Sequence, residues 1–119
     1  MSIPAEYFRK GSRNKYGAKK TVVGDIKFDS KKEANRWIEL QLLERAGEIS
    51  GLQRQVKIDL MGQHGPLLTR TGRKMRFTVD FAYTEKGAVI HEDVKGYATR
   101  DYEVRVAAAR AMGLEVKET

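Results

Sequence analysis

Two acidic side chains and one lysine, on neighbouring apolar segments, are the residues of this sequence most able to do chemistry. Asp80 lies in the first segment, and Asp93 and Lys95 lie in the second. The residues between the segments, 86–87, are Lys-Gly and predict a two-residue hairpin turn. In that register Asp80 stands directly opposite Asp93, where Cβ atoms are about 4.5–5.5 Å apart. Lys95 shares their face because side chains alternate along a strand.

This register is preferred because it keeps the apolar residues of both strands on the other face of the hairpin. A three-residue loop would instead pair Asp80 with Glu92. His91 joins the charged face and is interpreted as an exposed strand residue, while His64, in a loop, is assigned no chemical role. The apolar face is expected to carry Val79, Phe81, Tyr83, Ile90 and Val94.

The opposed carboxylates predict a site for a divalent cation. Two such groups repel each other, and a cation between them removes that cost. Oxygen ligands of this kind suit Mg²⁺ or Mn²⁺, with metal–oxygen distances of about 2.0–2.1 Å for Mg²⁺. Lys95 beside the ion would orient an attacking water or offset phosphate charge. An ordinary surface hairpin with a solvated charged face is the alternative that this spacing alone leaves open.

The rest of the chain has the patterns of elements that could hold this hairpin in a sheet. Helical spacing of apolar residues follows Asp29 and Ser30, either of which can cap a helix, and Gly47 ends that segment. The sequence predicts an α/β or α+β fold, with one mixed central sheet flanked by helices. In chain order the predicted elements are a hairpin over 21–28, this helix, strands over 50–61, 75–84 and 88–95, a helix over 100–112 and an edge strand over 114–117.

Composition favours an anionic partner and excludes several kinds of site. The 119 residues include 23 Lys and Arg against 16 Asp and Glu, for a net charge of +7. Nucleic acid is the expected partner, ahead of an anionic membrane surface. The sequence contains no cysteine, which excludes disulfides, zinc fingers and a cysteine nucleophile and fits a reducing cytoplasm. No apolar window is long enough to span a membrane, and the first residues lack the apolar core of a secretory signal.

Basic residues gather in two places. Residues 1–20 are predicted to be a flexible basic arm, and 21–119 a single domain. Gly62 to Thr71 is predicted to be a loop, made positive together with the residues that follow it. Both stretches are expected to hold a nucleic-acid backbone through its phosphates, without reading bases. A solvated tail is the alternative for the arm. The expected DNA-binding residues are Arg13, Lys15, Lys19 and Lys20 in the arm, and Arg70, Arg73, Lys74 and Arg76 in and after the loop.

Taken together, these residues resemble the PD-(D/E)XK nuclease superfamily. The resemblance rests on Asp80 followed by Asp93-x-Lys95, with Glu33 on an earlier helix. It rests also on the predicted helix–strand–strand–strand–helix–strand order. The stretches NKYGAKKT, FDSKKEANRWIEL, LQRQ, VDFAY and EDVKG are similar to small phage-encoded proteins of that superfamily. The resemblance covers roughly residues 14–117. Val79 stands at the position of the name-giving proline.

The resemblance implies an αβββαβ restriction-endonuclease-like core and metal-dependent hydrolysis of DNA phosphodiester bonds. Asp80, Asp93 and Glu33 would hold Mg²⁺ or Mn²⁺, Lys95 would be the catalytic lysine, and Gln55 would line the site. Branched or junction DNA is one candidate substrate, cut in one strand or, by a homodimer, in both. A phage-encoded protein would act in the cytoplasm of its bacterial host.

Three alternatives stand beside this interpretation. Ser30-x-x-Glu33 is also a capping box, in which Glu33 bonds back to the backbone of Ser30. A nucleic-acid-binding module of the same fold that does not cut DNA would share the basic surface. A basic structural protein of a phage particle would show no metal effect at all.

Overall fold

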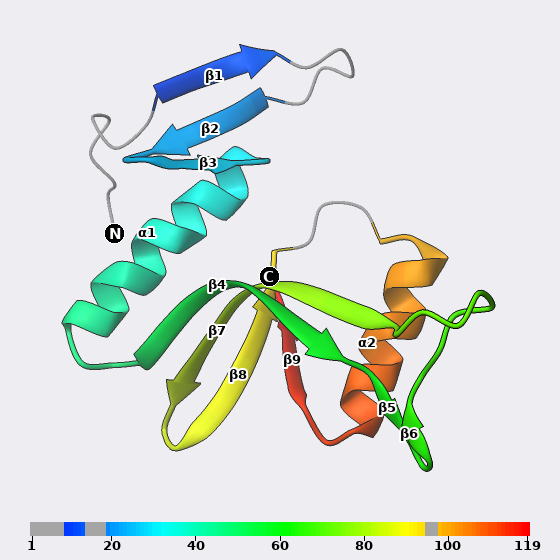
Figure 1. Cartoon of the computed structure of the whole chain (residues 1–119). Helices are drawn as coiled ribbons and strands as arrows, with labels where there is room; N and C mark the ends of the chain where they lie inside the picture. The colour runs from blue at the N-terminus through cyan, green and yellow to red at the C-terminus, as the bar shows by residue number, and fades with distance from the viewer. Residues whose placement is uncertain (1–8, 14–18, 95–97) are drawn as a thin grey trace. The chain divides into compact units, whose positions relative to one another are not determined.

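The computed structural model describes residues 9–13, 19–94 and 98–119. Lys95 and Lys15 lie outside these residues. The chain divides into two compact units, Met1–Glu48 and Ile49–Thr119 (Figure 1). The expected division into an arm over 1–20 and a single domain over 21–119 stays a prediction, and the first helix packs within the N-terminal unit. Among the described residues, no helix is long and apolar enough to cross a membrane.

The first unit contains a three-stranded antiparallel sheet, in the order β1-β2-β3. Its strands are β1 (Arg9–Arg13), β2 (Lys19–Val23) and β3 (Ile26–Phe28). The predicted hairpin over 21–28 is present, with Val23 paired to Ile26 across a two-residue turn at 24–25. Residues 9–13 and 19–20 were expected in a flexible arm, but they form strands and pair with each other. The rest of that stretch, 1–8 and 14–18, lies outside the described residues.

Helix α1 (Lys31–Arg45) begins and ends close to where the sequence predicts. Ser30 caps it, because the Ser30 hydroxyl accepts a hydrogen bond of 3.1 Å from the Glu33 backbone N–H. This contact is one half of the predicted capping box. The Trp37 ring lies 6.5 Å from that of Phe28, centroid to centroid. The buried cluster of this unit consists of Val23, Phe28, Ala34 and Ile38.

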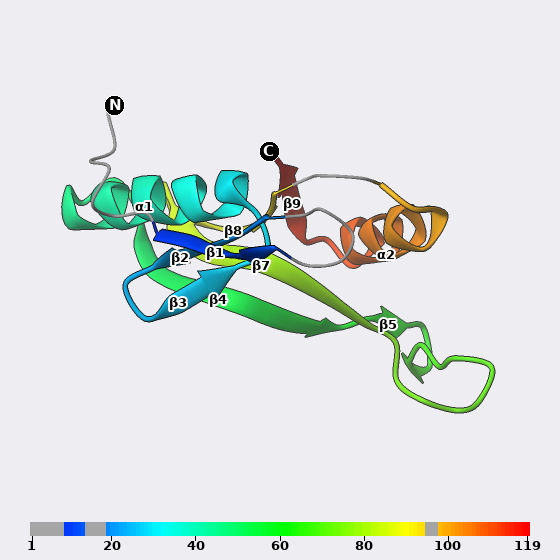
Figure 2. The same ribbon diagram turned by 90° about the horizontal axis from the view of Figure 1, so that it is seen from above.

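The second unit is a mixed four-stranded sheet with one helix, which confirms the α+β class (Figures 1 and 2). The strand order is β4-β7-β8-β9, with β4, β7 and β8 antiparallel and β9 parallel to β8. Helix α2 joins β8 to the parallel edge strand β9, as such a connection requires. The bounds are β4 (Ser50–Asp59), β7 (Arg76–Glu85), β8 (Ala88–Asp93), α2 (Arg100–Ala111) and β9 (Glu115–Glu118).

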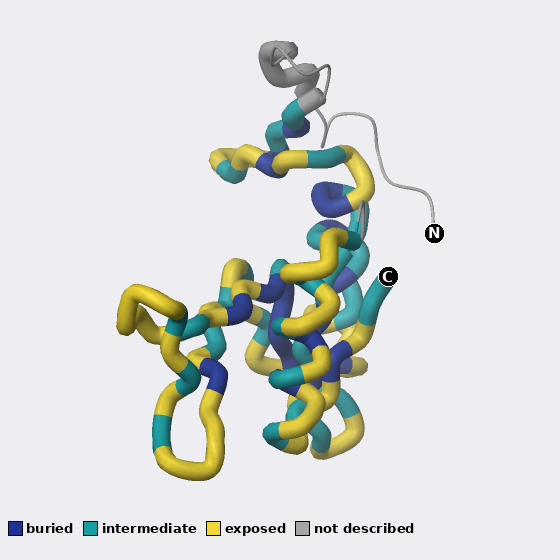
Figure 3. The backbone as a smooth tube through the Cα atoms, turned by 90° about the vertical axis from the view of Figure 1, so that its right-hand side faces the viewer, coloured by how far each residue is buried: buried dark blue, intermediate teal, exposed yellow. Residues whose placement is uncertain are grey.

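The core of this unit lies between α2 and the sheet, where buried positions gather along the strands (Figure 3). Burial alternates over the first half of β7, at Phe77, Val79 and Phe81, which is the pattern of a strand with one covered face; Ala82 and Tyr83 are buried as well. Phe77 meets Tyr102 of α2 edge to face, with ring centroids 5.9 Å apart. The buried members of the cluster are Leu60, Phe77, Val79, Val106, Ala109 and Val116.

The segment expected to be a loop over 62–71 is structured. It contains two short paired strands, β5 (Met61–Gly62) and β6 (Gly65–Pro66). A further bridge joins Leu68 to Lys74. The Gly- and Pro-rich composition marks the turns correctly, but it hides the backbone pairing between them.

The β7–β8 turn is the two-residue type that the sequence predicts. Lys86 and Gly87 have φ angles of 49° and 80°, and Glu85 pairs with Ala88 across the turn. Positive φ at both central residues is the geometry of a type I′ turn, which matches the twist of the flanking strands.

Lys86 carries a backbone cost in this turn, because a non-glycine residue is disfavoured in the left-handed region. Asn tolerates that region, so Lys86→Asn should raise the free energy of unfolding by about 0.5–1 kcal/mol. Urea denaturation of the two proteins measures the difference. The same substitution at Lys57, in the middle of β4, is the matched control and should not stabilise. Equal or lower stability of the Lys86 variant would contradict the assigned turn.

Candidate functional site

The register of the β7–β8 hairpin brings the acidic residues together as predicted. Ala82 pairs with His91, and Phe81 pairs with Glu92. These pairs exclude the three-residue loop, which would have placed Glu92 opposite Asp80. The ladder ends at Phe81 and Glu92, so Asp80 and Asp93 are the next opposed residues beyond its last pair.

Beyond that last pair, the two aspartates replace the backbone ladder with side-chain hydrogen bonds. The Asp80 backbone N–H donates to Asp93 Oδ1 at 3.2 Å. The Val94 backbone N–H donates to Asp80 Oδ2 at 2.8 Å. Each carboxylate therefore reaches across to the opposite strand. Asp80, Asp93 and Val94 define what is called here the hairpin fork.

The fork holds negative charge in a partly buried place. Burial, and next the charge of Asp80, raise the pKa of Asp93 from 3.8 to about 6. The hydrogen bond from the Asp80 backbone N–H opposes this rise, because it favours the ionised form. Ionising both carboxylates therefore costs free energy in the protein alone. A cation at the fork would offset that cost.

Glu92 lies next to Asp93 in the sequence but has a different environment. Its side chain is fully buried, with 0% exposure. The Tyr83 hydroxyl donates to Glu92 Oε1 at 2.6 Å, and the Thr119 hydroxyl donates to Oε2 at 3.2 Å. Of the two neighbouring acids, Asp93 is the one that meets Asp80, whereas Glu92 joins a buried hydrogen-bond network.

Gln55, on the adjacent strand β4, lies beside Asp80 as the sequence predicts. Its amide Nε2 donates to Asp80 Oδ1 at 3.4 Å. The backbone at Gln55 is strained, with a φ angle of 49°. The β4–β7 pairing runs through Arg54–Phe81 and Val56–Val79 but skips Gln55. Strained residues of this kind are concentrated at functional sites, where the surrounding structure holds them in place.

Tyr102, in the first turn of α2, is a site residue that the sequence does not reveal. Burial raises its pKa, and the charges of Asp93 and then Glu118 raise it further. Its phenol is therefore kept neutral beside the fork. Because α2 follows β8 by several residues, no local spacing links Tyr102 to Asp93. The only signal is the helical pattern, which places Tyr102 early in α2.

The structure does not place every predicted residue at the fork. Glu33 belongs to the first unit, where it is buried at the start of α1, and its proposed ligand role stays a prediction. Lys95 lies outside the described residues. His91, expected to be exposed, is half-buried, and its Nδ1 has no hydrogen-bond partner among the described residues.

The two carboxylates at the fork fit a hard cation that takes few of its ligands from the protein. Within the part of the chain that the structure describes, no three His, Cys, Asp or Glu residues come together as a metal site. Two carboxylates do meet, at Asp80 and Asp93. Mg²⁺ is commonly bound by one or two carboxylates, with water and substrate phosphate completing its shell. The residues present therefore suffice for Mg²⁺ or Mn²⁺ shared with a substrate.

The side chains predicted to bind DNA differ in how exposed they are and in whether they are already paired with an acidic residue. Arg70, Arg73 and Lys74 are exposed, and none forms an ion pair among the described residues. Arg76 is bound by Asp59, with Nε and Oδ1 2.9 Å apart. In the first unit, Arg13 of β1 pairs through the backbone with Lys19 of β2, and Lys20 is half-buried.

Comparison with known proteins assigns a family but no activity. Residues 13–119 match a family described as "Protein of unknown function (DUF1064)". Searches of curated proteins and of solved structures give no significant match. A function must therefore be inferred from the geometry of the fork.

The raised pKa of Asp93 can be measured directly. In protein free of divalent cations, the Asp93 carboxyl carbon should titrate near pH 6, and Asp80→Asn should shift its pKa downward. Carbon-detected NMR of the side-chain carboxyl group measures both values. Burial remains in the variant, so the pKa should stay above 3.8. A wild-type Asp93 that titrates near 3.8 would contradict the geometry of the fork.

The same shift predicts how stability depends on pH. The folded pKa of Asp93, about 6, lies above the unfolded value of 3.8, so this group favours folding increasingly as pH falls through that interval. At pH 7.5 without divalent cations, Asp93→Asn should therefore stabilise the protein by roughly 1–2 kcal/mol, allowing for partial solvent screening. The gain should vanish by pH 4. Glu115→Gln, on the exposed face of β9, is the control and should show no such trend.

Proposed function

This chain belongs to the DUF1064 family, and we propose that it is a Mg²⁺- or Mn²⁺-dependent DNA endonuclease centred on Asp80 and Asp93. One observation carries the proposal. The hairpin fork holds two carboxylates within reach of each other, where burial and mutual repulsion raise the pKa of Asp93 to about 6. The two backbone hydrogen bonds could be made with one carboxylate left neutral, whereas a pair of carboxylates with a raised pKa is the pattern expected of a functional site.

The order of elements supports the same assignment. From α1 onward, the larger elements are α1, β4, β7, β8, α2 and β9. This helix–strand–strand–strand–helix–strand order is the one that the PD-(D/E)XK resemblance implies. We therefore extend the α+β description to a restriction-endonuclease-like core, with Asp80 and Asp93-x-Lys95 in the positions of the superfamily motif.

In the proposed reaction, a water molecule loses a proton and attacks phosphorus in a single in-line displacement. The new P–O bond forms as the opposite P–O bond to a deoxyribose oxygen breaks, and that leaving oxygen takes up a proton from water. A divalent cation held by Asp80 and Asp93 would activate water and offset the negative charge that develops on the phosphate. Gln55 and the Val94 N–H fix the orientation of the Asp80 carboxylate through the bonds described above. Lys95 would donate to the phosphate, stabilising charge in the transition state. No covalent intermediate is required.

The positive net charge of the protein suits DNA as the substrate. The net charge is +7, and the exposed cations Arg70, Arg73 and Lys74 lie on the same unit as the fork. Phosphate neutralisation by such residues gives affinity without base recognition. The absence of cysteine fits action in a reducing bacterial cytoplasm.

A second function is favoured by one observation. Only two carboxylates meet at the fork among the described residues, and a non-catalytic DNA-binding module could retain them without cutting. That protein would bind DNA with the same salt dependence but would leave every substrate intact.

Cleavage of supercoiled plasmid in Mg²⁺ or Mn²⁺ distinguishes these functions. We expect nicked product that EDTA abolishes. Asp93→Asn should lower the rate at least about 100-fold, because it removes charge where the transition state requires it. Glu92→Gln is the matched control, because this neighbouring acid lies in the buried hydrogen-bond network. The variant should cut at a rate within a few-fold of wild type. Circular dichroism checks that it is folded.

Three results would contradict the proposal. Normal cutting by Asp93→Asn would remove Asp93 from the site. Loss of cutting in folded Glu92→Gln, with activity retained in Asp93→Asn, would exchange the roles of the two acids. Tight DNA binding without cleavage in either metal would favour the non-catalytic module.

A further inference from the structure

We propose that residues 61–74, called here the wing, recognise a discontinuity in DNA, such as a branch or a nick, and fix its distance from the bond that is cut. This inference rests on the proposed endonuclease function and deepens it, because it names the substrate class and the residues that select it. The wing has a backbone closed by hydrogen bonds and a surface of apolar and cationic side chains, and it lies on the strands that carry the fork.

The base of the wing is held by a buried residue and three backbone hydrogen bonds. Leu60 is fully buried, with 0% exposure. Its N–H donates to the Met75 carbonyl at 3.0 Å, and its carbonyl accepts from the Leu67 N–H at 2.8 Å. Met75 N–H donates in turn to the Leu67 carbonyl at 2.8 Å. The wing therefore leaves the sheet in a defined direction, and Figure 2 shows it extending beyond the ends of β4 and β7.

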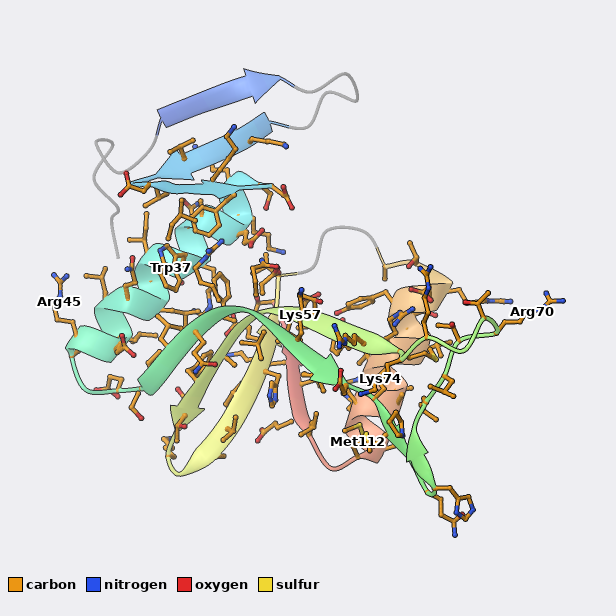
Figure 4. All side chains as sticks on the ribbon, viewed as in Figure 1. Trp37, Arg45, Lys57, Arg70, Lys74 and Met112 are labelled. Carbon is orange, nitrogen blue, oxygen red and sulfur yellow. The ribbon has the colours of Figure 1, made fainter. Side chains whose placement is uncertain are left out.

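The tip of the wing is also closed by hydrogen bonds. The Thr69 N–H donates to the Arg73 carbonyl at 2.7 Å, and the Thr69 hydroxyl accepts from the Arg73 N–H at 3.1 Å. Gly72, with a φ angle of 84°, donates to the Thr69 carbonyl at 2.9 Å. This turn presents Arg70 outward, away from the rest of its unit (Figure 4).

The exposed surface of the wing combines apolar side chains with cations. Leu68 is 58% exposed and Met61 is 45% exposed. Leu68 pairs across the wing with Lys74, so the apolar side chain and the cation are neighbours. The sequence from 60 to 75 contains no acidic residue.

A surface of exposed apolar side chains beside cations is complementary to nucleic acid in which the faces of some bases are accessible. Phosphates attract the cations, and the flat faces of unstacked bases accept an exposed apolar side chain. Intact duplex hides those faces by stacking, whereas the open end of a branch leaves them accessible and a nick lowers the cost of separating two stacked base pairs. Leu68 is therefore assigned to contact the open base pair, and Arg70, Arg73 and Lys74 to contact the flanking phosphates.

Strands β4 and β7 connect the wing to the fork without interruption by a loop. Met61 lies six residues after Gln55 on one side, and Lys74 lies six residues before Asp80 on the other. At about 3.3 Å per residue, each path spans about 20 Å. Because bases are stacked about 3.4 Å apart, this length corresponds to about five or six nucleotides. The cut should fall at that offset from the discontinuity.

The test uses one DNA sequence prepared as an intact duplex, a nicked duplex and a fork, incubated with full-length protein and Mn²⁺. We expect the nicked and forked substrates to be cut at least tenfold faster than the duplex. The cut should lie about five or six nucleotides from the discontinuity and should move with it when it is shifted along the sequence. Equal rates on all three substrates, or cut positions set by sequence, would overturn the proposal.

Variants separate the apolar contact from the cationic one. Leu68→Ser should bring the ratio of the cutting rate on nicked or forked DNA to the rate on intact duplex from at least ten down to about one. Val104→Ser is the matched control, since Val104 is 53% exposed on α2 outside the wing. Replacing Arg73 and Lys74 together by Ala should weaken binding to all three substrates and lower the slope of log affinity against log salt by about 2. If Leu68→Ser still prefers nicked and forked DNA, the assignment of Leu68 to the open base pair is wrong.

Binding measured without divalent cations keeps this test independent of cleavage. In competition assays with fluorescent fork DNA, unlabelled fork should displace the probe at concentrations at least fivefold below those of duplex, and Leu68→Ser should abolish that difference. This result with no cleavage would reject the endonuclease and keep the wing as a reader of DNA structure. Binding of an acidic polypeptide in preference to DNA would reject the wing proposal itself.

Discussion

The rest of the site depends on a single arrangement, in which two aspartates take over hydrogen bonding where the β7–β8 ladder ends. The Asp80 N–H and the Val94 N–H would need backbone partners if pairing continued. Here they bond to Asp93 Oδ1 and Asp80 Oδ2 instead. Each carboxylate is thereby fixed against the backbone of the opposite strand. The same bonds that complete the hairpin therefore position the charges of the site.

This arrangement explains why several less favourable features occur together. Ionised Asp93 is disfavoured beside Asp80. Gln55 adopts a strained backbone while its amide contacts the same carboxylate. Burial, and then the negative charge of Asp93, raise the pKa of Tyr102. The ionised Asp93 and the backbone of Gln55 each cost free energy in the protein alone, and all three features lie within one small region. The buried clusters of the two units supply the stability against which these costs are set.

The sequence predicts the hairpin and its acidic pair because both depend on local rules. A Lys-Gly turn fixes loop length, loop length fixes register, and register decides which acid meets Asp80. The α+β class, α1 with its Ser30 cap, and α2 follow from patterns of the same local kind.

Other features follow from contacts that no local pattern encodes. The strand pairing of residues 9–13 has little apolar signal, and the pairing inside the wing is hidden by turn residues. Burial of Glu92 depends on Tyr83 and Thr119, which are distant in sequence from one another. The left-handed backbone of Gln55 and the approach of Tyr102 to Asp93 likewise arise from tertiary packing.

The hairpin fork is proposed to bind a divalent cation, and the position of bound paramagnetic Mn²⁺ can be read from the NMR signals that it broadens. In ¹⁵N-labelled protein titrated with substoichiometric Mn²⁺, the amide signals of Asp80, Asp93 and Val94 should broaden first, and Asp93→Asn should abolish that local effect. Broadening that begins elsewhere on the chain, or that is unchanged in Asp93→Asn, would contradict the account.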